Sequence, residues 1–248
     1  TPVVNIIEKS PEEKISEIIP VKEFSDNEYL VMVTKNGIIK KTPASEYESI
    51  RKSGKIAITL KEGDELISIF KTTGNDNIFL ATRNGMAICF NENDAGAVGR
   101  TASGVKAIDL ADGDYVVGAE PVREDSKVLL VTDGGYGKCT DLTSFRIQHR
   151  GGKGLKAYKI TEKTGNIIGI SMVNDSEELI MVTSEGVVIR IRIKDIATTT
   201  GRITQGVRLI NLDDGVTVVS MDKISAEDAV EEESEENNTE VTTETTEE

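Results

Sequence analysis

VTKNGIIKKT at residues 33–42 shares one pattern with ATRNGMAICF at 81–90, VTDGGYGKCT at 131–140 and VTSEGVVIRI at 182–191. In each stretch, β-branched and other apolar residues flank a short turn that contains glycine. Because such a turn requires positive φ, which Gly and Asn adopt readily, each stretch predicts a tight β-hairpin. The four turn glycines lie 48, 50 and 51 residues apart, at Gly37, Gly85, Gly135 and Gly186.

Two further glycine series follow the hairpins at the same spacing. The second series comprises Gly54, Gly104, Gly154 and Gly206, and the third comprises Gly63, Gly113, Gly165 and Gly215. Recurrence at a fixed period indicates four copies of one structural unit of about 50 residues. In the first copy the β-rich runs predict strands at Tyr29–Thr34, Ile38–Thr42, Lys55–Leu60 and Glu65–Phe70.

Four short strands per unit, with no stretch of helical periodicity, predict an all-β fold of propeller type. Each four-stranded blade exposes an apolar face that its neighbours must cover. We expect one domain over residues 1–225, with full repeats at about 22–71, 72–122, 123–173 and 174–225. Residues 1–21 resemble the second half of a repeat, with Pro2 in the place of Gly54. This half repeat is typical of a fragment cut from a longer subunit.

The composition excludes several classes of protein. With 38% hydrophobic residues in 248, the chain can bury a sizeable core. Two cysteines argue against a disulfide-stapled secreted module, and 4% aromatic residues argue against a stacking platform for single strands. No apolar stretch is long enough to span a membrane, and no export signal precedes the repeats. We therefore expect a cytoplasmic protein that does not contact the membrane.

The net charge of -14 is concentrated at the C-terminus. Residues 226–248 contain eleven acids and no base, which leaves 29 bases and 32 acids in residues 1–225. Like charges and few apolar residues predict a disordered tail. Two roles for this tail stay open: it competes with DNA for the basic surface, or it increases solubility.

Bases recur in the same part of three repeats, around the stretch that leads from the first glycine to the second. Seven bases and two acids lie between Lys35 and Lys61 and again between Lys138 and Lys163, and five bases and one acid lie between Arg190 and Arg208. Since repeats meet around one axis, these clusters would form a basic rim suited to the phosphates of duplex DNA. The alternative is that they are ordinary solvated charges.

The segment Gln148-His149-Arg150-Gly151-Gly152-Lys153-Gly154 is the most specific motif. Consecutive glycines can bring backbone N–H groups close to an anion, and the flanking Arg150 and Lys153 add positive charge. His149 is the single histidine of the chain, so the sequence offers no metal site or hydrolytic dyad based on histidine.

This segment resembles the box motif of the C-terminal domain of the bacterial DNA gyrase A subunit, a type IIA topoisomerase. The repeat length, VTKNGIIKKT and TTTGRITQGVRLI extend the resemblance over residues 1–225. It implies a β-pinwheel, in which neighbouring blades exchange strands, that wraps double-stranded DNA around its outer edge. It also implies, as partners, the rest of the gyrase polypeptide and an ATPase subunit that drives negative supercoiling. The family has its principal box in the first blade, and His149 replaces the usual basic residue.

The resemblance and the charge pattern together predict the DNA-contacting residues. Arg150 and Lys153 would be anchors, and Gln148, His149, Gly151, Gly152 and Gly154 would complete the loop. The track would comprise Lys40, Lys41, Arg51, Lys52, Lys138, Arg190, Arg192 and Arg202. We expect no cofactor and no catalysis by this chain alone. Cys89 and Cys139 occupy equivalent strand positions that are typical of buried residues, which argues against a catalytic thiol. The alternatives are the corresponding domain of topoisomerase IV and a kelch-type protein-interaction propeller.

Overall fold

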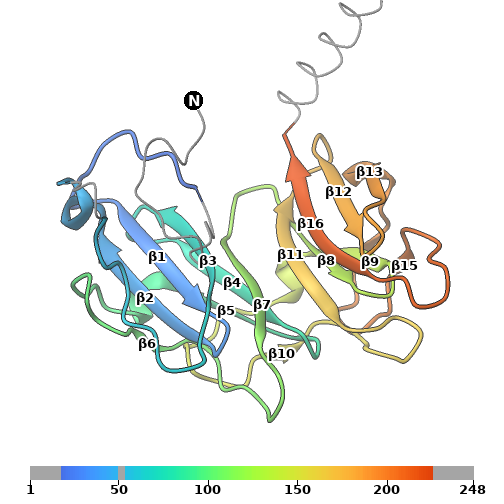
Figure 1. Ribbon diagram of the computed structural model, residues 1–248, viewed down its shortest axis with the longest axis horizontal. Helices are drawn as coiled ribbons and strands as arrows, with labels where there is room; N and C mark the ends of the chain where they lie inside the picture. Colours follow the sequence, from blue (N-terminus) through green and yellow to red (C-terminus); the bar gives the residue numbers. More distant parts are fainter. Residues whose placement is uncertain (1–17, 50–53, 226–248) are drawn as a thin grey trace, which may run out of the picture.

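A computed structural model of the chain describes residues 18–49 and 54–225. These residues form four small sheets, the blades, joined by loops and short 3-10 turns (Figure 1). The strand pairs are antiparallel except for one short parallel pair in the third blade. From the innermost strand outward, blade 1 contains β3 (Leu66–Thr72), β1 (Tyr29–Thr34), β2 (Ile38–Pro43) and β6 (Val105–Lys106). Blade 2 contains β7 (Val116–Pro121), β4 (Asn77–Thr82), β5 (Met86–Asn91) and β10 (Leu155–Lys156).

Blades 3 and 4 repeat this order with differences at the outer edge. Blade 3 contains β11 (Ile167–Val173), β8 (Lys127–Thr132), β9 (Tyr136–Asp141) and, on β9, both β15 (Val207–Arg208) and β14 (Thr198–Thr199). Blade 4 contains β16 (Val218–Ile224), β12 (Glu178–Thr183) and β13 (Val188–Arg192). The hairpins predicted from the glycine turns are confirmed in all four blades.

Neighbouring repeats exchange strands. The segment after the second-series glycine leaves its own repeat and pairs with the hairpin of the preceding one: β6 with β2, β10 with β5 and β15 with β9. We call these contacts the first, second and third junctions. Their segments are residues 100–108, 150–158 and 202–210. The exchange confirms the predicted β-pinwheel, and it explains why a single repeat cannot complete a blade.

The strand predicted at Lys55–Leu60 is wrong, because these residues have no regular secondary structure. In the later repeats the equivalent segment becomes a two-residue strand by pairing with the preceding hairpin. Within the described residues, no hairpin precedes β1. In that part of the chain, residues 55–60 therefore have no strand with which to pair.

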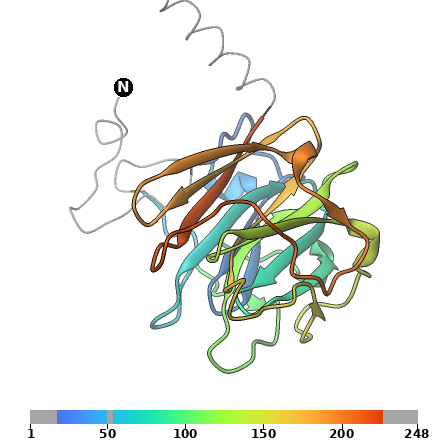
Figure 2. The same ribbon diagram turned by 90° about the vertical axis from the view of Figure 1, so that its right-hand side faces the viewer.

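The innermost strands β3, β7, β11 and β16 are neighbours in that order and converge on the axis of the ring. They line a hollow of about 300 Å³ with residues from all four blades. Figure 2, a view of the right-hand side of Figure 1, turns blade 4 (orange to red) toward the viewer. The exchanged strands lie at the opposite edge of each sheet, so they form the outside of the ring.

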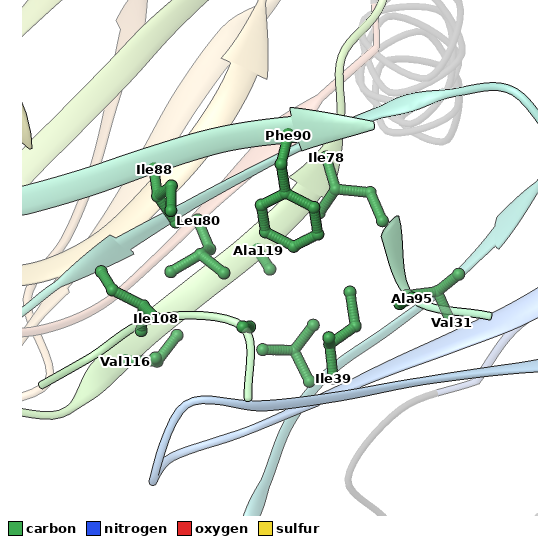
Figure 3. Close-up of a cluster of buried hydrophobic side chains, with 12 residues drawn as sticks. Val31, Ile39, Ile78, Leu80, Ile88, Phe90, Ala95, Ile108, Val116 and Ala119 are labelled. Atoms are coloured by element: carbon green, nitrogen blue, oxygen red, sulfur yellow. The ribbon is translucent and has the colours of Figure 1, made fainter. Parts of the chain in front are cut away.

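Apolar side chains fill the space between adjacent blades. In the cluster of Figure 3, Val31 and Ile39 of blade 1 pack with Leu80 and Phe90 of blade 2, and Ile108 joins them from the exchanged segment. All five side chains are at most 2% exposed. Each contributes roughly 1.5–3 kcal/mol through burial, so strand exchange stabilises the contact between two blades.

Both cysteines occupy the predicted buried strand positions. Cys89 lies on β5 and Cys139 on β9, with 5% and 0% of their surfaces exposed. Burial raises the pKa of each thiol to about 11. Each therefore remains a protonated, apolar packing residue near neutral pH.

Two predicted regions lie outside the described residues: the acidic tail at 226–248 and most of the half repeat at 1–21. Arg51 and Lys52 also lie outside them. In the part of the chain that the structure describes, no helix is long and apolar enough to cross a membrane.

Candidate nucleic-acid interface

The box loop, residues 148–154, belongs to the third repeat but rests on blade 2. The backbone N–H of Gln148 donates to Cys89 O at 2.8 Å, and that of Gly151 donates to Ala107 O at 2.6 Å. The loop then enters β10, which pairs with β5. Strand exchange therefore positions the box at the outer edge between the second and third repeats.

Arg150 is held by the preceding repeat rather than projecting freely. Its Nε donates to Asp94 O at 2.7 Å, and its backbone N–H donates to Asp94 Oδ2 at 3.2 Å. One guanidinium NH group donates to Lys106 O at 3.0 Å. His149 Nδ1 also lies 3.2 Å from Asp94 Oδ2, but the imidazole is 98% exposed. Arg150 thus fixes the loop and presents the rest of its charge at the surface.

Backbone geometry explains Gly154. Its φ is +75°, and a Cβ at this position would lie 2.5 Å from Ala87 O, closer than a side chain permits. The predicted anion cradle of loop N–H groups is wrong in part, because the N–H groups of Gln148, Arg150 and Gly151 already donate to protein oxygens. Glycine is required at 154 for close approach of the exchanged strand to blade 2.

The box arginine has a counterpart in each described exchange. Arg100 donates to Ile56 O, Arg150 to Lys106 O and Arg202 to Lys156 O, at 3.2, 3.0 and 3.2 Å. Each arginine therefore links its own loop to the segment one repeat earlier. Loops that lack the double glycine keep this contact, so the arginine has a structural role common to the repeats.

Three predicted track residues, Lys40, Lys41 and Lys138, are buried, so their predicted exposure on a rim is wrong. They are 1%, 3% and 0% exposed. Lys40 Nζ donates to the carbonyl oxygens of Ala57 and Arg100. Lys138 Nζ donates to Arg202 O at 2.5 Å and to Thr204 Oγ1 at 3.0 Å. Lys40 and Lys138 each stand three residues after a turn glycine, and backbone carbonyls of the next loop replace water around each ammonium.

Lys41 is buried in an ion pair that joins two blades. Its Nζ lies 2.8 Å from Glu92 Oε2, and the two side chains are 4% and 0% exposed. The ammonium also lies 4.1 Å from the centroid of the Tyr29 ring, a cation–π geometry. A phosphate outside the ring cannot reach this group while the pair is closed.

The pKa values of Lys40 and Lys138 reflect their burial. Loss of hydration is the largest cause, and the nearby Arg100 or Arg202 charge adds to it, so the pKa of each ammonium falls from 10.5 to about 8. Both groups are still mostly charged at pH 7. The charge is compensated by carbonyl oxygens and does not contribute to an exposed rim.

The remaining predicted cations differ in exposure. Lys153 and the strand pair Arg190 and Arg192 are exposed, and Arg202 is partly exposed. Arg190 and Arg192 alternate with half-buried isoleucines on β13, which confirms that they share one face. Arg190 contacts Glu178, and Arg192 Nε lies 2.9 Å from Asp195 Oδ2. These four residues stay candidates for DNA contact.

Sequence reasoning missed a regular series of cations on the outermost strands. Lys106 on β6, Lys156 on β10 and Arg208 on β15 are all exposed. Each stands two residues after a second-series glycine, in GVKAI, GLKAY and GVRLI, so the spacing could have identified them. Because these strands form the outside of blades 1, 2 and 3, the structure places the three charges on successive outer edges.

The comparisons with known proteins agree with this architecture. The family model described as "DNA gyrase C-terminal domain, beta-propeller" matches residues 28–73, 76–123, 126–174 and 177–225. The DNA gyrase A polypeptide of Staphylococcus epidermidis is 46% identical over 230 residues, which cover 92% of this chain and 26% of that protein. Its Ureaplasma parvum counterpart is 44% identical over 220 residues, 89% of this chain and 26% of that protein. The chain thus spans about a quarter of the length of these relatives.

Two solved structures resemble the fold closely. The C-terminal domain of DNA topoisomerase IV superposes with a TM-score of 0.86 at 29% identity, covering 97% of this chain and 75% of that one. The DNA gyrase A C-terminal domain superposes with a TM-score of 0.79 at 25% identity, covering 90% and 75%. Four consecutive matches to one family model, each centred on a blade, decide the assignment: this chain belongs to the DNA gyrase C-terminal domain family.

Proposed function

We propose that this chain is the non-catalytic part of a gyrase A polypeptide that binds duplex DNA and wraps it around the outer edge of the blades. The observation that carries the proposal is the series Lys106, Lys156 and Arg208, exposed on the outermost strands of three successive blades. Such a series contacts phosphates at regular intervals and reads no base sequence. Lys153 and the free face of Arg150 add charge beside the second junction.

Distributed contacts suit the energetics of wrapping. Bending 20–30 base pairs by 40–90° costs on the order of 1–6 kcal/mol, so one loop is too little to hold a bent duplex. Cations on several blades share this cost. The wrapped segment would let the complete bacterial enzyme, in the cytoplasm, introduce negative supercoils with the ATP turnover of its partner subunit.

A matched pair of triple variants tests DNA binding. Lys106→Ala/Lys156→Ala/Arg208→Ala removes three outer-strand charges, of which Lys106 is ion-paired with Asp109. Lys35→Ala/Lys71→Ala/Lys127→Ala removes three charges away from the outermost strands, which are ion-paired with Glu65, Glu28 and Asp175. Fluorescence anisotropy with a labelled duplex over a salt series measures affinity. The slope of log K against log salt should fall by about 0.9 for each phosphate that the first variant no longer neutralises, and it should stay unchanged in the second variant. Equal slopes in both variants would contradict the proposal.

The similarity to the topoisomerase IV domain makes that domain's role the second candidate. DNA would then be bound without a stable wrap. Relaxation of a nicked and religated plasmid in the presence of the chain separates the two roles. A shift in linking number that disappears in the Lys106, Lys156 and Arg208 variant supports wrapping, whereas binding without any shift supports the second role.

A further inference from the structure

The contact between His149 and Asp94 determines where the imidazole carries its proton. Asp94 ends the 3-10 turn η3 (Glu92–Asp94) of the second repeat. Its Oδ2 lies 3.2 Å from His149 Nδ1 and 3.2 Å from the backbone nitrogen of Arg150. Because an ionised carboxylate only accepts hydrogen bonds, this contact requires a proton on Nδ1. The neutral imidazole then has a lone pair, and no proton, on Nε2.

Nε2 belongs to a side chain that is 98% exposed, in the loop that carries the box motif. The oxygens of a DNA phosphate also only accept hydrogen bonds, so they cannot bind a nitrogen that offers a lone pair. A phosphate contact at Nε2 therefore requires a second proton on the ring, which makes the imidazolium cation. Histidine is the side chain whose charge ordinarily changes between about pH 5 and 8. Phosphate binding at this nitrogen is thus coupled to proton uptake.

The three junctions differ at this position. The residue before the junction arginine is Gly99 at the first junction and Gly201 at the third, so neither carries a side chain there. At the second junction, Arg150 donates to Asp94 through both Nε and its backbone N–H. These bonds fix the backbone next to His149 on the outer edge of blade 2. Of the three junctions, the second is therefore the one with an imidazole at this point.

We propose that His149 is a proton-dependent phosphate contact and that Asp94 is the positioning residue that makes it so. Binding of duplex DNA at the second junction then places a proton on Nε2, and the affinity falls as the pH rises. This proposal rests on the DNA binding proposed above and adds to it a pH dependence that arises at one position.

Other charged groups lie on the elements around the imidazole. They are Glu92 and Asp94 on η3, Lys106 and Asp109 at β6, and Arg146, Arg150 and Lys153 on the loop itself. Glu92 is buried in its pair with Lys41, and Lys106 pairs with Asp109. Exposed lysine and arginine stay charged below about pH 9, so they add no pH dependence near neutrality. Lys40 and Lys138, each with a pKa of about 8, do titrate, but they lie at the first and third junctions.

Duplex affinity in the parent chain and in two variants of His149 tests the proposal. We expect the parent to bind about tenfold more weakly at about pH 8.5 than at about pH 6, since one charge-assisted hydrogen bond is lost. The slope of log K against log salt should also decrease in magnitude by about 0.9. His149→Gln should bind weakly at both pH values and His149→Lys strongly at both. Subtraction of the trend in His149→Gln removes the contribution of Lys40 and Lys138.

Asp94→Asn tests the positioning role. The amide oxygen can still accept from Arg150 N–H, while the amide nitrogen can donate to Nδ1. The neutral ring can then carry its proton on Nε2 and donate it to a phosphate. We expect binding to persist at high pH and most of the pH trend to disappear, whereas a merely structural role would weaken binding equally at both pH values. Arg146→Gln is the matched control, because it removes an exposed loop charge and should keep the trend of the parent.

NMR of the ring nitrogens shows the protons directly, since the chain has a single histidine. In the free chain at high pH, Nδ1 should be protonated and Nε2 unprotonated, and addition of duplex near neutral pH should protonate Nε2. The proposal is overturned by a proton on Nε2 in the free neutral ring, by an unchanged ring in the bound chain, or by equal pH trends in the parent and His149→Gln. Absence of duplex binding at every pH would instead contradict the proposed function itself, and this proposal with it.

Discussion

Hydrogen bonds from a buried lysine stabilise the first and third junctions, whereas hydrogen bonds from the backbone of the box loop stabilise the second junction. Lys40 donates to Arg100 O, and Lys138 donates to Arg202 O. At the second junction the equivalent hairpin position is Ile88, which is 1% exposed and carries no donor. There, Gly151 N–H donates to Ala107 O at 2.6 Å.

The buried lysine and the box-loop backbone support the same arrangement of loop and hairpin. In all three junctions, a loop arginine donates to a carbonyl one repeat earlier, and a positive-φ glycine follows it. The box therefore replaces a buried charge with a tighter loop. A lysine in this part of a repeat can therefore be a buried structural residue instead of a DNA contact. Its position within the hairpin determines which of these two roles it has.

Among the substitutions, breaking the Lys41–Glu92 pair between blades 1 and 2 should have the largest effect on stability. Lys41→Met leaves the Glu92 carboxylate buried without its cation, and removal of one partner from a buried pair typically costs about 3–5 kcal/mol. The free energy of unfolding from urea titration, followed by circular dichroism, measures this destabilisation.

The double variant Lys41→Met/Glu92→Gln is the control for that experiment. A neutral amide keeps an acceptor for the N–H groups of Gly74 and Asp76 and removes the unpaired charge. We expect it to recover a large part of the stability. If the double variant is as unstable as Lys41→Met, packing around the lysine stem matters more than the charge.

A substitution in the box itself should have an intermediate effect. Gly154→Ala forces a side chain to φ +75° and toward Ala87 O, so we expect a destabilisation of about 1–3 kcal/mol. Gly152→Ala is the matched control, because its φ is not positive and its added Cβ would lie 3.8 Å from His149 O. The shift in Tm of each variant measures the difference. Equal shifts would show that the second junction does not depend on the close approach.

The sequence predicted the fold well because the glycines mark geometry that only glycine tolerates. The turn glycines and second-series glycines located the hairpins and the exchanged segments. The prediction of a strand at 55–60 failed because the equivalent two-residue strands form by pairing with a hairpin and not through their own propensity. Local sequence shows that a segment can extend but does not show whether a hairpin is available to receive it.

The candidate site was harder to predict, because charge counts carry no information about burial. Lys40, Lys41 and Lys138 lie on the same short strands as buried isoleucine and cysteine, and the carbonyls that receive Lys40 and Lys138 come from neighbouring loops. Lys106 and Lys156 carry less obvious sequence signals but lie on the outermost strands. Only the order of strands within each blade separates the two groups.

The last expected effect is a pH dependence of stability confined to the first and third junctions, which contain the buried lysines. The pKa of Lys40 and Lys138 is about 8 in the folded chain and 10.5 without burial. Between these values the unfolded chain binds more protons, so these groups make stability rise with pH and lose that contribution as pH falls through 8. The difference in unfolding free energy between the parent chain and Lys40→Met/Lys138→Met should therefore shift toward the parent from pH 8 to 10.5. Lys153→Met, at an exposed position of the second junction, should show no such trend. A flat difference for the double variant would mean that both ammonium groups keep their protons, with the carbonyl oxygens compensating fully for the missing hydration.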